Sequence, residues 1–140
     1  MIMEKEFIIR GRYWNRTKCF PDLNDYIGAL GRSPHAGGEM KRKFMSIASR
    51  CIRHDLRGWE TKNPVVIHYE CAEPQDGHYR DKSNVVSFAV KVIEDSLQKC
   101  SVIVNDSPRY MRDYTHTVSY VDARSLPYIK VTIKEVESSD

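Results

Sequence analysis

The hydrophobic residues of this chain follow two different periods, which divide the sequence into strands and helices. Four segments are rich in β-branched and aromatic residues and are bounded by turn residues, as expected of strands. They comprise residues 7–13, 65–71, 115–121 and 128–136. In residues 39–57 and 84–99, apolar side chains instead recur every three or four positions. This spacing predicts two amphipathic helices, the first of which ends at Gly58.

The segments between these elements predict how the strands and helices are connected. Residues 21–38 contain repeated proline and glycine residues, which predicts a long loop. Residues 122–127 predict a hairpin-like connection between the last two strands, and residues 102–104 form a short apolar piece before a turn. The predicted order of elements is β, α, β, α, β, β, in which two strands are neighbours in the sequence and strands and helices do not strictly alternate. We therefore expect an α+β fold over residues 1–140, one domain with a mixed or mostly antiparallel sheet and two main helices on one face.

Composition places the chain among globular proteins. Its 140 residues are 41% hydrophobic and 29% charged, which excludes a disordered polypeptide. No apolar run approaches the roughly 20 residues that span a bilayer, and the N-terminal residues lack a secretory apolar region. The four cysteines are scattered and none has C-x-x-C spacing. We therefore expect reduced thiols, a cytoplasmic location, no zinc ribbon and no membrane partner.

Charge is distributed unevenly between the two halves of the sequence. Before Asn63 the chain has 13 Lys or Arg against 7 Asp or Glu, and from Asn63 onward it has 9 against 12. A basic half beside an acidic half suits a protein that attracts a polyanion with one surface and holds cations with another. The alternative is that these charges are solvated faces without a ligand.

The helix expected at residues 84–99 has the most suggestive arrangement of polar residues. At about 100° per residue, its polar side chains form one stripe. This stripe consists of Asn84, Ser87, Lys91, Asp95 and Gln98. Asp81 precedes the helix, Asp106 follows it, and the side chain of Lys91 leans back toward the helix N-terminus. Lys91 could there approach Asp81, and a carboxylate, a lysine and a helix N-terminus in one place are the groups that phosphodiester cleavage requires, with Mg²⁺ favouring one or two carboxylates.

Each of these residues also has an ordinary interpretation. Asp81 can be a helix N-terminal aspartate beside a capping Ser83. Lys91 can be a solvated lysine paired with Asp95 one turn later. Asp106 can belong to a simple turn. The order and spacing of these residues are more specific than any single one of them.

Together the motifs of this chain resemble the RusA family of Holliday-junction resolvases, in particular the forms carried by phages and prophages. The resemblance covers nearly the whole chain. It is found at residues 21–27, 36–41, 73–74, 80–84, 93–97 and 102–106. The most specific match is residues 80–84, Arg-Asp-Lys-Ser-Asn, which is similar to the Arg-Asp-x-Asp-Asn of the family.

The resemblance implies a homodimeric endonuclease that depends on Mg²⁺, with Mn²⁺ as a substitute. Such an enzyme binds four-way DNA junctions and nicks two strands of like polarity, with one active site per subunit of a two-fold dimer. The motif match makes Asp81 and Asp106 metal ligands and Lys91 the catalytic basic residue. It also makes Arg80 a phosphate contact. We expect the two carboxylates to converge on one ion.

Ser83 departs from the family motif, because it stands where a second metal-binding aspartate is expected. A neutral hydroxyl holds a divalent cation less firmly than a carboxylate. One interpretation is an active enzyme in which Glu70, Glu73 or Asp76 supplies the missing ligand, with Ser83 and Glu70 beside the metal. A second is a protein that binds branched DNA and cuts it poorly, and a third is a substitution peculiar to this copy. We favour retained activity.

Further DNA contacts are expected around the segment with repeated glycines. Basic side chains and backbone amides there can bind phosphates. The residues concerned are Arg32, Lys41, Arg42 and Lys43. Asn24 either positions DNA or caps its own turn. The alternative for the basic residues is that they are solvated charges on a helix surface.

Overall fold

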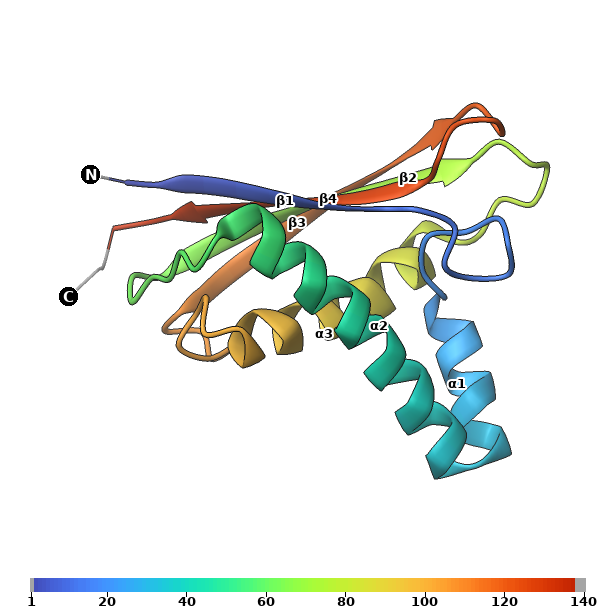
Figure 1. Cartoon of the computed structure of the whole chain (residues 1–140), viewed down its shortest axis with the longest axis horizontal. Helices are drawn as coiled ribbons and strands as arrows, with labels where there is room; N and C mark the ends of the chain where they lie inside the picture. The colour runs from blue at the N-terminus through green and yellow to red at the C-terminus, as the bar shows by residue number, and fades with distance from the viewer. Residues whose placement is uncertain (1, 138–140) are drawn as a thin grey trace.

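The computed structural model describes residues 2–137, which fold into three helices on one face of a four-stranded sheet (Figure 1). The elements in chain order are β1 (Glu4–Arg10), α1 (Leu23–Arg32), α2 (Pro34–Leu56), β2 (Val65–Pro74), α3 (Lys82–Lys99), β3 (Met111–Val121) and β4 (Tyr128–Glu135). The α+β class expected from the sequence is confirmed, as is a mixed sheet.

The strand order β1-β4-β2-β3 places the last strand in the middle of the sheet. β4 pairs antiparallel with both β1 and β2, whereas β2 pairs parallel with β3. The two parallel strands are joined through α3, because a parallel pair needs a crossover connection. The hairpin expected at residues 122–127 is wrong, because β2 lies between β3 and β4. This segment instead carries the chain past the end of β2.

Alternation along the strands explains why all three helices lie on the same side. In β1, Phe7 and Ile9 are buried while Glu6 and Arg10 are exposed. The buried residues of β2 and β4 face the same side, where α2 and α3 cover them. The opposite face of the sheet has no helix within the described residues and carries side chains such as Glu70 and Lys130. Which face a strand residue occupies therefore decides whether it can approach the helices.

Most of residues 21–38 belong to α1 and the start of α2, so the expected long loop is wrong. Asp22 caps α1 and forms a reciprocal capping box with Asp25, in which each side chain accepts the other residue's backbone N–H at 2.9 Å. Ser33 ends α1 and also caps α2, where its hydroxyl accepts the N–H of Ala36 at 3.0 Å. Pro34 occupies the first turn of α2, the one helical position that tolerates it. These cap residues are the sequence feature that indicates two helices here, whereas the glycines suggested a loop.

Gly37 explains why a glycine stands inside a helix at this corner. A Cβ atom there would lie 2.8 Å or less from two side-chain atoms of Leu30. The glycine therefore allows α1 and α2 to pack closely as an antiparallel pair, rather than ending a helix.

The remaining boundaries agree with the sequence pattern to within a few residues. α2 ends at Leu56, where Arg57 and Gly58 adopt left-handed backbone angles, so the expected stop at Gly58 is confirmed. β1 begins and ends about three residues earlier than expected, and β3 begins at Met111 rather than residue 115. In residues 2–137, no helix combines the length and apolar character needed to cross a bilayer.

Candidate functional site: the two ends of helix α3 and the basic face of α2

Asp81 is the N-cap of α3, so the expected helix N-terminal aspartate is confirmed, whereas the expected cap at Ser83 is wrong because Ser83 lies inside the first turn. Its Oδ1 atom accepts the backbone N–H of Ser83 at 3.0 Å and the hydroxyl of Ser83 at 2.8 Å. The bond from the Ser83 hydroxyl, with backbone N–H groups of Asn84 and Ser83, lowers the pKa of Asp81. The carboxylate is exposed and ionised, so it presents one negative charge to solvent at the helix N-terminus.

Ser83 supports Asp81 rather than supplying a second ligand charge. Its hydroxyl donates to the Asp81 carboxylate, and its backbone carbonyl accepts the hydroxyl of Ser87 at 2.6 Å. A serine therefore stabilises the ionised aspartate here, whereas an aspartate in its place would repel it. The site at this end of α3 carries one carboxylate where the family motif carries two.

Arg80 is held by carboxylates of its own chain. Its Nε and Nη2 atoms donate to the two oxygens of Glu73 at 2.8 and 3.1 Å, and its Nη1 atom lies 3.5 Å from Asp25. Only 13% of its side chain is exposed. The guanidinium joins β2 and α1 to the segment before α3, so the structure gives Arg80 a structural role. Sequence reasoning missed this cluster, because its acids lie on elements far apart in the chain.

Each of the three acids expected to replace the missing metal ligand is already bonded to another residue of the chain. Glu73 is paired with Arg80. Asp76 accepts Lys18 Nζ at 3.1 and 3.3 Å. Glu70 lies on the helix-free face of the sheet, where it accepts the hydroxyl of Tyr128 at 3.2 Å. The placement of Glu70 beside a metal is therefore not supported, because it and Glu73 point to opposite faces of β2.

Asp106 lies at the other end of α3 from Asp81. The 18-residue helix is about 27 Å long. The turn that carries Asp106 is held at the start of β2, where Val65 N–H donates to Tyr110 O at 2.7 Å. Asp81 follows the end of β2 (Figure 1). The expected convergence of these carboxylates on one ion is therefore wrong for a single chain.

Lys91 does not approach Asp81 either. It lies ten residues after Asp81, about 15 Å along the helix axis, which is farther than a lysine side chain reaches. Nor does Lys91 pair with Asp95, because the Asp95 carboxylate binds Lys41 Nζ at 2.7 Å. Among residues 2–137 no three Asp, Glu, His or Cys side chains are grouped to hold a metal. One chain therefore does not fit the two-carboxylate Mg²⁺ site that the family motif implies.

The far end of α3 has an acidic cluster instead. Glu94 is half-buried, and burial raises its pKa to about 6, with the negative charges of Asp106 and Asp95 adding to the rise. Lys91 lowers it slightly. The buried hydroxyl of Tyr69 has no hydrogen-bond partner among the described residues. Glu94 therefore titrates closer to neutrality than an exposed glutamate.

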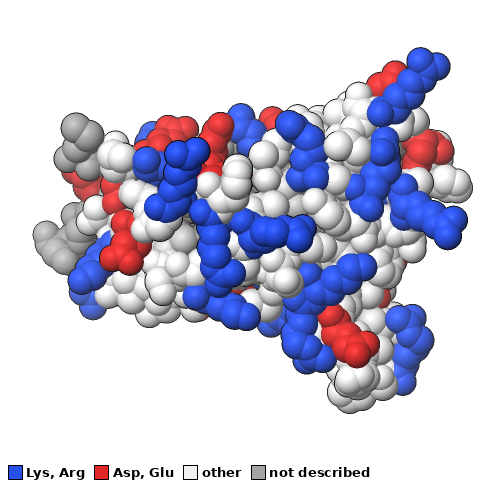
Figure 2. Space-filling view, viewed as in Figure 1, with Lys and Arg blue, Asp and Glu red and all other residues white. Residues whose placement is uncertain are grey.

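The exposed face of α2 is strongly basic. Figure 2 shows Lys and Arg side chains gathered over this helix on the side turned to the viewer. The exposed members are Arg42, Lys43, Arg50 and Arg53 on α2, and Arg57 at its C-cap. Within residues 2–137, none of these five forms an ion pair with a carboxylate. We refer to these five residues as the basic face.

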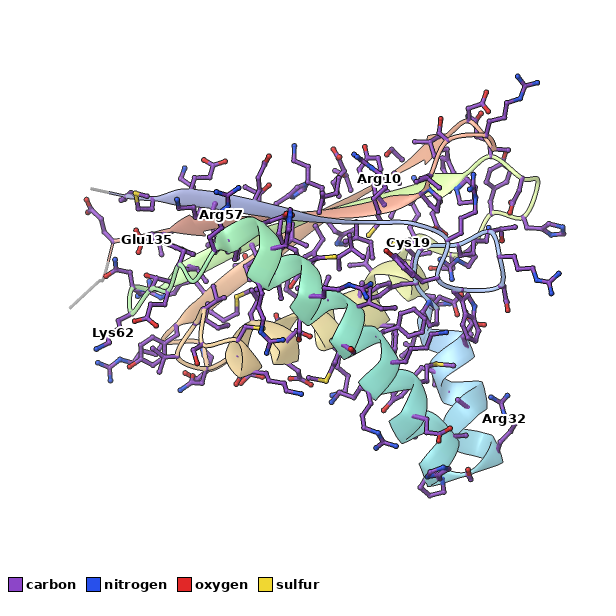
Figure 3. The ribbon with its side chains drawn as sticks, in the orientation of Figure 1. Arg10, Cys19, Arg32, Arg57, Lys62 and Glu135 are labelled. Carbon is purple, nitrogen blue, oxygen red and sulfur yellow. The ribbon has the colours of Figure 1, made fainter. Side chains whose placement is uncertain are left out.

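Only part of the expected DNA-contact set belongs to this face. Lys41 is paired with Asp95, whereas Arg42 and Lys43 point to solvent. Arg32 lies at the tip of the α1–α2 corner, and Arg57 lies at the opposite end of α2 beside β1 (Figure 3). Asn24 is exposed in the first turn of α1, which Asp22 caps, so Asn24 does not cap this helix. Arg50, Arg53 and Arg57 were not among the expected DNA contacts, although the sequence already indicated that the helix expected at residues 39–57 is basic over much of its exposed surface.

No protein-family model matches this chain, and no curated protein matches it either.

Proposed function

We propose that this protein binds DNA through the basic face of α2. The observation that carries the proposal is the row of five exposed Lys and Arg side chains on one helix without carboxylate partners in the described structure. Cations that are not neutralised by the protein's own acids are available to phosphates. When they bind DNA they displace the counterions condensed on it, and this release drives binding. The helix extends over 23 residues, about 35 Å, which is about one turn of duplex DNA.

Branched DNA is the substrate class that we propose, and a homodimer is the binding form. The support is the resemblance of residues 80–84 and the other motifs to junction resolvases. A two-fold dimer carries two basic faces, and a four-way junction offers them two equivalent arms. The alternative that the charges are merely solvated predicts no DNA binding at physiological salt.

Gel-shift titrations with a four-way junction and a linear duplex of equal length test this proposal. We expect tighter binding to the junction and a steep loss of affinity with added salt. Changing Arg50 and Arg57 to Gln should flatten the salt dependence for both DNAs. The control changes Arg124 and Lys134 to Gln, because these residues lie outside α2. Equal binding by both double variants would contradict a role for the basic face.

A second candidate function is paired cleavage of the bound junction by the homodimer. The observation that favours it is the exposed, ionised Asp81 at one end of α3, with Asp106 exposed at the other end. A two-fold axis perpendicular to α3 near its midpoint brings Asp81 of one copy beside Asp106 of the other. Such a dimer has two composite sites that pair Asp81 with Asp106, a pairing that residues 2–137 of a single chain do not make.

Mixing two inactive variants tests this second candidate. We expect Asp81→Asn and Asp106→Asn each to abolish nicking in Mg²⁺ or Mn²⁺. A co-purified heterodimer of the two variants should regain one intact site and make single nicks rather than paired ones. A heterodimer without activity, beside an active parent protein, would contradict the composite site. If the parent protein itself makes no nicks, cleavage is excluded and the DNA-binding proposal still stands.

A further inference from the structure

A small groove lies between the middle of α2 and the end of α3, away from Asp81. Its volume is about 210 Å³. The lining residues are Arg42, Met45, Ser46, Ser49, Arg53 and Lys99. Three of these six are cations, two are serines and none is acidic. The groove therefore has the lining of an anion site.

The helical period of α2 creates this lining. Arg42, Ser46, Ser49 and Arg53 follow one another at intervals of four, three and four residues, which places them on one stripe of the helix. α3 is fixed beside this stripe, because Lys41 of α2 binds Asp95 of α3 at 2.7 Å and Ser96 Oγ of α3 lies 3.5 Å from Met45 O. Lys99 in the last turn of α3 is thereby held against the stripe.

The acid of α3 that is closest to Lys99 in the sequence is already neutralised. Asp95 lies one turn before Lys99 on α3, but its carboxylate is occupied by Lys41. Within residues 2–137, neither Arg42, Arg53 nor Lys99 forms an ion pair. The cations of the groove therefore remain uncompensated within the described chain.

Ser49 supplies an independent indication of a ligand. It is only 4% exposed, and its hydroxyl has no hydrogen-bond partner in the part of the chain described. Two other helical serines, Ser87 and Ser96, donate to the carbonyl four residues earlier at 2.6 and 2.7 Å. Ser49 does not do this. A buried hydroxyl without a partner is costly, and an oxygen-rich anion in the groove supplies the missing acceptor.

We propose that this groove binds a phosphodiester group of the DNA backbone. Arg42, Arg53 and Lys99 neutralise the phosphate, and the Ser49 hydroxyl donates to one of its oxygens. The inference rests on the proposed DNA binding, because only a DNA strand lying along α2 would place a phosphodiester oxygen in this groove. It adds to that proposal a defined subsite on α2, where Ser49 fixes the position of the strand rather than only attracting it.

Salt-dependent binding of linear duplex and four-way junction DNA tests the charges. The Arg42→Gln, Arg53→Gln double variant should bind more weakly than the parent, and its slope of log affinity against log salt should be shallower by about 1.8. The matched Arg124→Gln, Lys134→Gln control should keep the parent slope. If both double variants have the parent slope while the parent binds DNA, the groove inference is overturned and the DNA-binding proposal stands.

Ser49→Ala separates a ligand contact from a structural role. Removing the unpartnered hydroxyl should raise the melting temperature without DNA and still weaken DNA binding severalfold. A purely structural serine would change the melting temperature and leave the affinity unchanged, which would overturn the proposal. Ser119→Ala is the control, because Ser119 is exposed on β3, outside the groove, and should leave the affinity for DNA unchanged.

Titration with inorganic phosphate, followed through the backbone amide resonances of α2, distinguishes the source of the phosphate. We expect shifts at residues 46–53 only at millimolar phosphate, and at far lower concentrations of DNA. Saturation by micromolar phosphate, with no DNA binding, would show a site for a small phosphorylated molecule and overturn both the diester assignment and the proposed function. Shifts confined to residues outside the groove, with DNA still bound, would overturn the groove alone.

Discussion

The two ends of α3 contain the acidic residues of the most specific motifs, and they are built in opposite ways. At the N-terminal end Arg80 binds Glu73, and Asp81 is stabilised by Ser83. At the C-terminal end burial disfavours the charge of Glu94, and the like charge of Asp106 adds to the cost. The pKa of Asp81 is therefore lowered and that of Glu94 raised, within one helix. The comparison shows that an acid in a motif can be a structural partner or a strained charge, and that only its neighbours decide which.

Removing Arg80 tests whether the paired charges at the N-terminal end of α3 stabilise the fold. We expect Arg80→Ala to destabilise the fold by about 3 kcal/mol, because the largely buried Glu73 carboxylate loses both of its hydrogen bonds. Urea unfolding followed by circular dichroism measures this. The Arg80→Met, Glu73→Leu double variant should recover much of the loss, because no buried carboxylate is left without a partner; Asp25 remains, but it is partly exposed and still accepts the Asp22 N–H. A loss below 1 kcal/mol for Arg80→Ala would show that the pair is not structural.

Glu94 tests the opposite end of the helix. Its folded pKa of about 6 exceeds the ordinary value of 4.5, so the folded state binds the proton more tightly than the unfolded state. Stability contributed by this proton is present below pH 4.5 and is lost as the pH rises through 6. Glu94→Gln should remove this loss and stabilise the protein by about 1 kcal/mol at pH 7.5, allowing for solvent screening. Unfolding curves at pH 4.5 and 7.5 check it. A variant with the parent's pH dependence would contradict the assignment.

The cap function of Asp81 predicts a smaller effect. Asp81→Ala removes the acceptor of the Ser83 N–H and should lower the melting temperature by about 2–4 °C. Asp81→Asn keeps a capping side chain and should stay close to the parent. Calorimetry distinguishes the two variants. Equal melting temperatures for all three proteins would mean that the cap does not stabilise α3.

Ser83→Asp has the smallest expected effect on stability, and its main effect is on the pKa of Asp81. The variant loses the hydroxyl that donates to Asp81 and gains a like charge beside it, so the pKa of Asp81 should rise. Titration of the Asp81 carboxyl by NMR measures this shift. A pKa that stays at the parent value would show that Ser83 does not hold the carboxylate ionised.

The sequence predicted those parts of the fold that depend on local periodicity. α2 and α3 follow from their apolar spacing, and β2 and β4 from their β-branched residues. Residues 21–38 could not be assigned by counting glycines, because Gly37 is a packing residue against Leu30. The central position of β4 could not be predicted either. Strand order depends on which edge of β2 each strand finds, and this is a tertiary property.

The candidate site shows the same limit more sharply. Asp81 and Asp106 flank one helix in the sequence, and this arrangement suggested a shared site. A helix separates its ends in proportion to its length, so residues that flank α3 lie far apart in space. The true partners of Arg80 come from β2 and α1, at separations that no local motif indicates. The basic face, in contrast, was readable because one helix carries all of its residues.

Ser33 joins α1 and α2 directly. Because one residue terminates α1 and caps α2, the two helices meet without any linker that would absorb movement. α1 in turn faces the Arg80 guanidinium through Asp25, and the next residue along the chain, Asp81, caps α3. The ion pair between Asp25 and Arg80 therefore ties α1, and with it α2, to the N-terminus of α3.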